Sequence, residues 1–275
     1  MFTTNHLIQL EKNGYIGPID FLTNDEVKNL KEKILNYKRW IFESGFVLNQ
    51  VLASGAAITH KKELINFLIK YFSDDVVSLG SRPFLGGGEP GKAIPWHHEM
   101  DFWRIFGNDT SGVQTWLTLD DADVNNGALQ VIPGSHKLSE LDPINIYGLD
   151  VFSKKENLHN YSIQFLKSKL EKNNFEITTF KSKPGQLYLF HWKLLHRTAP
   201  YNKFSERRLT INSRYVSKSE NFNNDWCNKN PRFVCSNNKI YNSDLLKMKY
   251  SDIVYSKYVH SFKTIYKKIL KKVIK

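Results

Sequence analysis

Four short strand-forming segments in the middle of the chain constrain its fold more than any other feature. They are QTWLTL at 114–119, GALQVI at 127–132, QLYLF at 186–190 and RLTINSRY at 208–215. Each is rich in β-branched, aromatic or aliphatic residues, and Gly, Pro or polar residues lie between them. Short strands separated by turn signals are typical of a mainly β domain.

The first two segments predict a local pairing. A polar turn that includes Asn125, Asn126 and Gly127 separates them, and Pro133 with Gly134 ends the second. Apolar runs on either side of an Asn-Gly turn are a strong short-range signal for a β-hairpin. We therefore expect these two strands to pair with each other.

Two helices are predicted before the strands. Thr23 and Glu26 form the pattern of a capping box, which begins a helix that we expect to run to about Ser44. A second helix is expected over Lys61 to Phe72. The helices precede strands that we expect from about Val76 to Tyr215.

Composition fits one large domain with a buried core. The 275 residues are 41% hydrophobic, and no apolar run approaches the roughly 18 residues that a membrane span needs. The N-terminus lacks the basic and apolar regions of a signal peptide. Only Cys227 and Cys235 are present, without the spacing of a zinc site or a disulfide framework. These features predict a cytoplasmic protein.

Two histidines and a carboxylate have the spacing of a metal site. His97 and Glu99 are two residues apart, so on a strand both side chains share one face while His98 points away. His196 follows another strand about a hundred residues later. Two imidazoles and one carboxylate form the facial triad of non-haem Fe(II), which leaves coordination positions open for O2 and an organic co-substrate. A second register, His98 with Asp101, stays open, although these two would lie on opposite faces of a regular strand.

With these motifs the chain resembles the phytanoyl-CoA dioxygenase family of Fe(II)- and 2-oxoglutarate-dependent oxygenases. Three motifs carry the resemblance in the family's order: WHHE at 96–99, NGALQVIPGSHK at 126–137, and the run from His196 to Arg207. It extends from about Gly14 to about Tyr215. It implies a double-stranded β-helix, a jelly-roll of the cupin-like type with flanking helices, over residues 1–217. Residues 218–275 would form a C-terminal extension that is not an independent domain.

The resemblance also implies roles for individual residues. His97, Glu99 and His196 would be the iron ligands. Arg207, eleven residues after His196, would bind the C5 carboxylate of 2-oxoglutarate, and a guanidinium suits that role because its planar donors hold a carboxylate with two hydrogen bonds.

The co-substrate would meet two further positions. Thr198 would contribute a hydroxyl to the same carboxylate, and Trp116 would place an aromatic ring against it. Arg208 is the rival to Arg207, and the two point to opposite faces of a strand. We favour Arg207 for its offset from His196.

One position departs from the family, which usually has Asp where this chain has Glu99. The extra methylene requires another rotamer or a strand set slightly further back. The predicted activity is oxidation of a small organic molecule, such as a natural product or a lipid or envelope precursor. Hydroxylation is the default outcome, with O2 as co-substrate and CO2 and succinate as co-products. The shared motifs do not choose the substrate.

Two other classes of function remain open. In the first, the chain is a cupin-like metal-binding pseudoenzyme or binding protein. In the second, suggested by the net charge of +12, it is a nucleic-acid demethylase or binder. Much of the basic charge lies in the C-terminal tail, and no basic stripe interleaved with aromatic residues crosses the core. We therefore expect a small-molecule substrate and no nucleic-acid partner.

The tail itself predicts a basic amphipathic helix. Apolar residues from Tyr258 to Lys275 recur at helical spacing, and seven lysines from Lys257 onward occupy the other faces, with no acidic residue after Ser256. The apolar stripe packs against the barrel, the commoner arrangement, or lies on an anionic membrane surface. The second arrangement would give the protein a peripheral membrane contact. The oligomeric state is not indicated.

Overall fold

A computed structural model describes most of the region in which the motifs lie. It describes residues 2–36, 55, 58–86, 93–94, 96–98, 112–138, 176–199, 208–220 and 239–241. Among the predicted features, Glu99, Arg207, Asp101 and the C-terminal helix lie outside these residues.

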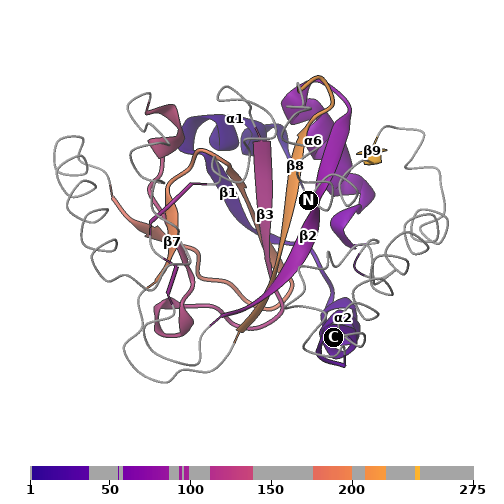
Figure 1. The fold of residues 1–275 in the computed structure, drawn as a ribbon, viewed down its shortest axis with the longest axis vertical. Coiled ribbons are helices and arrows are strands. Elements are labelled where there is room, and N and C mark those ends of the chain that lie inside the picture. Colours follow the sequence, from indigo (N-terminus) through magenta and orange to yellow (C-terminus); the bar gives the residue numbers. More distant parts are fainter. Residues whose placement is uncertain are drawn as a thin grey trace, which may run out of the picture.

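Two antiparallel sheets form the body of the described structure (Figure 1). The first sheet has the strand order β1-β6-β3-β8-β2-β9 and the second the order β5-β4-β7. In the first sheet the strands are β1 (Tyr15–Asp20), β6 (Gln186–His191), β3 (Gly112–Thr118), β8 (Arg208–Ser217), β2 (Val76–Gly86) and β9 (Lys239–Tyr241). The second sheet contains β5 (Thr178–Thr179), β4 (Leu129–Val131) and β7 (His196–Thr198).

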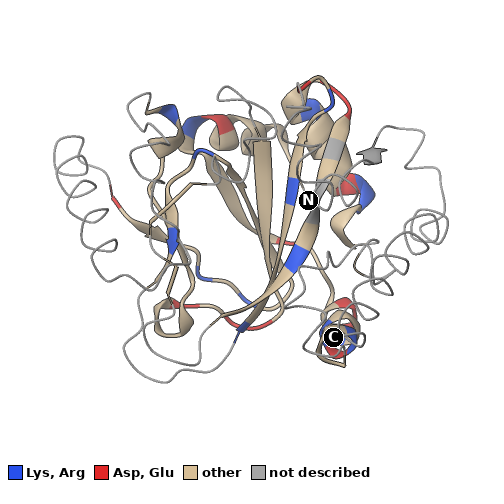
Figure 2. Ribbon diagram, in the orientation of Figure 1, with Lys and Arg blue, Asp and Glu red and all other residues tan. Residues whose placement is uncertain are grey.

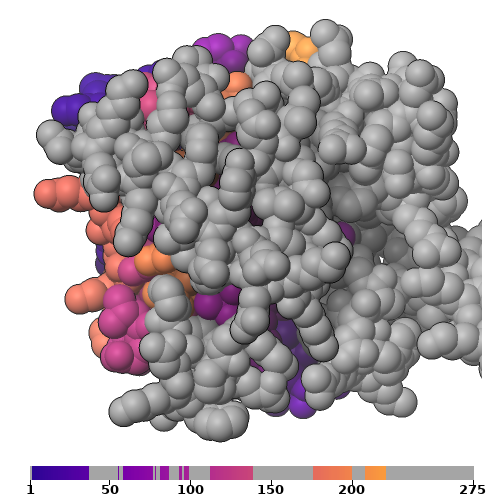
Figure 3. Space-filling view, turned by 60° about the vertical axis from the view of Figure 1, so that its left-hand side comes forward, coloured from indigo at the N-terminus to yellow at the C-terminus, as the bar shows by residue number. Residues whose placement is uncertain are grey.

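The chain passes repeatedly from one sheet to the other. β3 lies in the first sheet, β4 and β5 in the second, β6 in the first, β7 in the second and β8 in the first. Residues 112–138 and 176–199 therefore lie side by side on the surface, as Figure 3 shows. A cluster of buried apolar residues that includes Trp116, Val131 and Phe190 fills the space between the sheets. The architecture is the jelly-roll that the sequence predicted.

The predicted hairpin between 114–119 and 127–132 is wrong. β3 uses both of its edges within the first sheet, pairing with β6 on one side and β8 on the other, whereas β4 pairs with β5 and β7. Asp123 caps a short 3-10 helix, η2 (Val124–Asn126), and Gly127 follows it with a φ of 76°. The segment thus forms a crossing between the sheets, because alternation along a strand does not specify its partner.

Three helices cover the outer face of the larger sheet. They are α1 (Thr4–Asn13), α2 (Asn24–Leu35) and α6 (Lys62–Phe72). Leu10, Leu30 and Leu68 from these helices belong to one buried cluster with Leu117 and Ile211 of the sheet. The outer face of the sheet is therefore apolar and closed by the helices.

The predicted capping box is present at α2. The backbone N–H of Glu26 donates to the Thr23 hydroxyl, and the backbone N–H of Thr23 donates to the Glu26 carboxylate. The helix ends at Leu35, earlier than the predicted end near Ser44. Residues 37–50 lie outside the described part of the chain. α1 was not expected from the sequence.

None of the described helices is long and apolar enough to cross a membrane.

One strand of the larger sheet comes from the C-terminal extension. β9 pairs antiparallel with β2, and Lys239 lies opposite Ser78. This pairing makes residues 239–241 of the extension an edge strand of the larger sheet.

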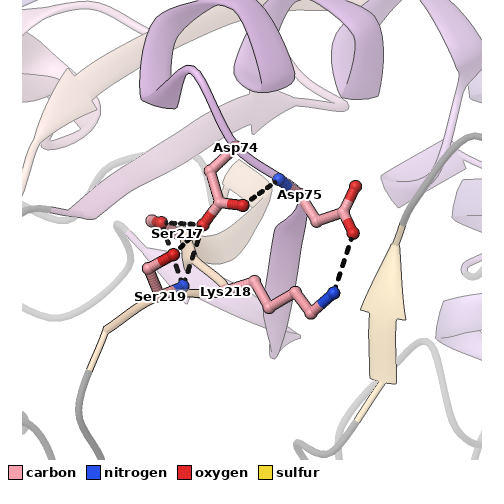
Figure 4. Close-up of polar contacts among 5 residues, drawn as sticks. All are labelled: Asp74, Asp75, Ser217, Lys218 and Ser219. Carbon is pink, nitrogen blue, oxygen red and sulfur yellow. Dashed lines mark hydrogen bonds and ion pairs between the residues drawn. The ribbon is translucent and has the colours of Figure 1, made fainter.

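A cluster of polar contacts joins the turn after α6 to the end of β8 (Figure 4). The hydroxyls of Ser217 and Ser219 and the backbone N–H of Ser219 donate to the Asp74 carboxylate. These hydrogen bonds favour the charged form and hold the pKa of Asp74 well below its ordinary value near 3.8. Lys218 pairs with Asp75 at 3.1 Å. The cluster fixes the start of β2 against the end of β8.

Substitution of Asp74→Asn should lower the melting temperature by a few degrees at neutral pH. The folded-state pKa is depressed, so the stabilisation is present above the unfolded pKa and is lost as pH falls below about 4 toward the folded pKa. The difference in melting temperature between wild type and variant should therefore shrink on acidification. Asp121→Asn, which removes an exposed pair with Lys183, is the matched control and should change little. Equal effects of both substitutions at neutral pH would contradict this assignment.

Candidate active site

Two of the predicted metal ligands lie side by side. His97 forms an antiparallel bridge with His196 of β7, in which each backbone N–H donates to the other residue's carbonyl at 2.9 and 2.8 Å. The N–H of Thr198 donates to the carbonyl of Ile94 at 3.0 Å, which extends the pairing. The ring centres of His97 and His196 are 4.1 Å apart. Residues 99 positions apart in sequence are thus held together by backbone hydrogen bonds.

The ring of His196 has a defined orientation. Its Nδ1 lies 2.8 Å from the carbonyl oxygen of Leu194, and because a carbonyl only accepts, Nδ1 carries the proton and donates. Nε2 is then the nitrogen with the lone pair. The ring is 3% exposed, and the ring of Phe190 lies edge-on at 5.0 Å. Metal-binding histidines commonly donate their second N–H to a carbonyl in this way.

This pair fits a metal ion. Two imidazoles bound to one ion at adjacent positions have ring centres about 4–5 Å apart, given metal–nitrogen bonds of about 2.1 Å. Within the described ranges no group of three His, Cys, Asp or Glu side chains is gathered for a metal, since Glu99, the third predicted ligand, lies outside them. The described residues thus include two of the three predicted ligands.

Two residues next to the pair in sequence, His98 and Thr198, are also buried. His98 is 2% exposed, and alternation places it on the other face of the strand from His97. Thr198 is buried on the same side of β7 as His196. His136 and His191 lie together elsewhere, with ring centres 5.3 Å apart.

These two histidines are neutral and structural. Nε2 of His136 donates to the carbonyl of Glu11, and Nδ1 of His191 accepts from the backbone of Lys193. Burial lowers the pKa of His191 to about 3 and also lowers the pKa of His136. The hydrogen bond of His136 fastens the last turn of α1 beside the sheets.

The interior of the barrel contains a guanidinium. Arg208, the first residue of β8, is 4% exposed, and its Cζ lies 5.3 Å from the ring centre of Trp116. Its Nε donates to the carbonyls of Asn126 and Gly127 at 3.1 and 3.0 Å, and Nη2 donates to Gly127 as well. Gly86 opposes Arg208 across the strands, and a Cβ there would lie 2.8 Å from Cζ. The absence of a side chain at Gly86 makes room for the guanidinium.

The alternation of side chains along β8 explains why Arg208 lies inside. Leu209 and Ile211 belong to the apolar cluster under the helices, so Arg208 and Thr210 face the interior with Trp116. Arg207 lies outside the described residues. In the sequence analysis, the offset from His196 favoured Arg207. The burial of Leu209 and Ile211 under the helices is the observation that favours Arg208.

Solved structures share the fold of this chain. EctD from S. alaskensis, solved with 2-oxoglutarate and 5-hydroxyectoine, is 19% identical with a TM-score of 0.64, over 80% of this chain and 78% of that one. The epimerase SnoN from nogalamycin biosynthesis, described as α-ketoglutarate-dependent, is 14% identical with a TM-score of 0.56, over 78% and 81%. CytC3, solved with Fe(II) and α-ketoglutarate, is 15% identical with a TM-score of 0.54, over 78% and 77%.

Comparison of the sequence gives the family. No curated protein sequence matches the chain. The sequence model of the phytanoyl-CoA dioxygenase family matches residues 10–208, which include both histidines, β3 to β7 and the start of β8. The family, the jelly-roll and the paired histidines agree with one another: the chain belongs to the phytanoyl-CoA dioxygenase family of non-haem iron, 2-oxoglutarate-dependent oxygenases.

Proposed function

We propose that the protein oxidises a small organic molecule with Fe(II), 2-oxoglutarate and O2, and releases CO2 and succinate. The observation that carries this proposal is the bridge between His97 and His196, which holds two imidazoles at a separation suited to one ion. Glu99 is proposed as the third ligand. Bound iron would supply the activation of O2 and the oxidation of the substrate.

The chain's own residues would position the reactants. The Leu194 carbonyl holds the ring of His196 so that Nε2 is the coordinating nitrogen. The aromatic residues between the sheets exclude water from this side of the site, because Phe190 contacts the ring and Phe180 stacks on Tyr188 at 4.0 Å. Exclusion of water strengthens charge interactions at the site.

We propose Arg208 as the partner of the C5 carboxylate of 2-oxoglutarate, with the ring of Trp116 beside it. The support is its burial on the interior face, where Trp116 and Phe190 of the neighbouring strands also point. Arg207 is the alternative from the sequence, and Thr198 is proposed as the hydroxyl that assists either arginine. A guanidinium suits the role because it binds a carboxylate with two parallel hydrogen bonds.

The reaction outcome is proposed as hydroxylation. EctD was solved with a hydroxylated compound, 5-hydroxyectoine, while SnoN is an epimerase, so proteins with this fold differ in outcome. A metal-binding protein without turnover is the alternative, and it would bind Fe(II) without forming succinate.

Replacement of His97, Glu99 or His196 by Ala should reduce Fe(II)-dependent succinate formation at least about a hundred-fold. Loss of a group that only orients a metal ligand already costs roughly 10–100-fold, so loss of a ligand should cost more. His98→Ala is the control and should retain iron and most activity in protein whose folding is checked by melting temperature. Loss of iron in His98→Ala with retention in His97→Ala would favour the register of His98 and Asp101.

Arg208→Ala should raise the KM for 2-oxoglutarate at least about thirty-fold while Fe(II) still binds. Removal of one partner of a buried charge pair costs roughly 2–5 kcal/mol. Arg207→Ala is the matched variant, since the sequence predicts that its side chain points to the opposite face. Steady-state kinetics with varied 2-oxoglutarate decides between them, and the reverse pattern would assign the role to Arg207.

We also propose that residues 258–275 bind peripherally to the surface of anionic membranes. They belong to the extension 218–275, which is not a separate domain. The support is compositional: an apolar stripe with lysines around it, to which anionic lipid adds attraction of about 1 kcal/mol per lysine. Full-length protein should sediment with anionic liposomes at low salt, and a chain that ends at Ser256 should not. Equal sedimentation of both would mean that the helix packs on the barrel.

A further inference from the structure

The interior face of the larger sheet carries a polar row beside the histidine pair. Gln114 of β3 lies directly opposite Phe190, which contacts the ring of His196, and on its other side opposite Arg214 of β8. Two residues further along β3, Trp116 lies opposite Asn212 of β8. Alternation puts Gln114 on the same face as Trp116, which is in the buried cluster between the sheets. Gln114 therefore faces the interior at the level of the proposed metal ligands.

Gln114 is buried without partners in the described part of the chain. Its side chain is 0% exposed, and both Oε1 and Nε2 lack a hydrogen-bond partner among the described groups. Oδ1 of Asn212 is likewise buried without a partner there. Buried polar atoms are nearly always paired, and an exception indicates a missing ligand or water. Two acceptors and one donor are thus presented toward the interior.

The co-substrate cannot satisfy this set. 2-Oxoglutarate at neutral pH offers two carboxylates and a ketone, which only accept hydrogen bonds. It could pair with Nε2 of Gln114 but not with Oε1 of Gln114 or Oδ1 of Asn212. Within the described part of the chain, these two oxygens therefore need a donor from an ordered water or from a ligand other than 2-oxoglutarate.

Two arginines share this face. Arg214 opposes Gln114, and Arg82 of β2 opposes Asn212, so both guanidiniums originate on the interior face of β2 and β8. Figure 2 shows basic positions on these two strands within a sheet whose other described residues are mostly uncharged. Both arginines already have partners, so they do not define the charge of the molecule that pairs with Gln114 and Asn212.

We infer that the substrate is a small molecule that carries a hydroxyl or amino group, and that Gln114 and Asn212 bind that group. This inference rests on the proposed oxygenase function and names its substrate class. An unsubstituted hydrocarbon chain against this face would leave both amides unpaired. Gln114 is thereby a specificity-determining residue.

The first test measures stability without iron, 2-oxoglutarate or substrate. Gln114→Leu replaces a buried, unpaired amide by an apolar group of similar size, and should raise the melting temperature by about 2–4 °C. The matched control is Gln130→Leu, because Gln130 donates to Thr179 at 3.1 Å and accepts from Arg197 at 2.9 Å. That control should melt lower than wild type. A decrease in both variants would overturn the inference, because Gln114 would then be satisfied within the protein.

The second test identifies the substrate class. Succinate release with Fe(II), 2-oxoglutarate and O2 is measured with the aqueous and the organic phase of a methanol–chloroform extract of the source cells. The aqueous phase should stimulate wild type, and Gln114→Leu should require at least ten-fold more of it. Stimulation by the organic phase alone, by neither phase, or equally in the variant would overturn the inference.

The two proposals fail in different ways. Wild type that consumes no 2-oxoglutarate under any of these conditions would refute the proposed function. Wild type that turns over 2-oxoglutarate slowly without substrate, but meets any of the contrary outcomes above, would refute only the assignment of Gln114.

Discussion

The backbone bridge between His97 and His196 is the interaction on which the site depends. Two hydrogen bonds of 2.9 and 2.8 Å fix residues from two distant segments at one height of the barrel. The Leu194 carbonyl then sets the tautomer of one ring, and Phe190 covers it. The ring of His196 is therefore oriented without a metal, which lowers the entropy lost when it binds one.

The two faces of the larger sheet have different roles. In the described part of the chain, the outer face packs under three helices and forms the larger of the two buried apolar clusters. Because those helices hold the sheet, the interior face can carry groups that are costly to bury, such as Arg208 and the unpaired amide of Gln114. A buried amide without an internal partner weakens a fold unless a ligand completes it.

Much of this could be read from the sequence, and the exceptions have physical reasons. Period-two patterns and turn residues gave the strands, and Thr23 with Glu26 gave the start of α2, because these are local preferences. The pairing of β3 was mistaken, since an alternating strand near a polar turn does not reveal that both of its edges are taken by distant strands. The partnership of His97 with His196 was inferable only from the motif and the resemblance. The interior position of Arg208 depended on which face of β8 the helices cover.

The central claim is that this chain is an iron- and 2-oxoglutarate-dependent oxygenase, and a stoichiometric titration tests it most directly. Under anaerobic conditions the purified protein should bind one Fe(II) and then one 2-oxoglutarate per chain, as measured by native mass spectrometry. Admission of O2 should convert the bound 2-oxoglutarate to succinate. Folded protein that binds no Fe(II), or that holds both and forms no succinate even with the cell extract present, would contradict the account.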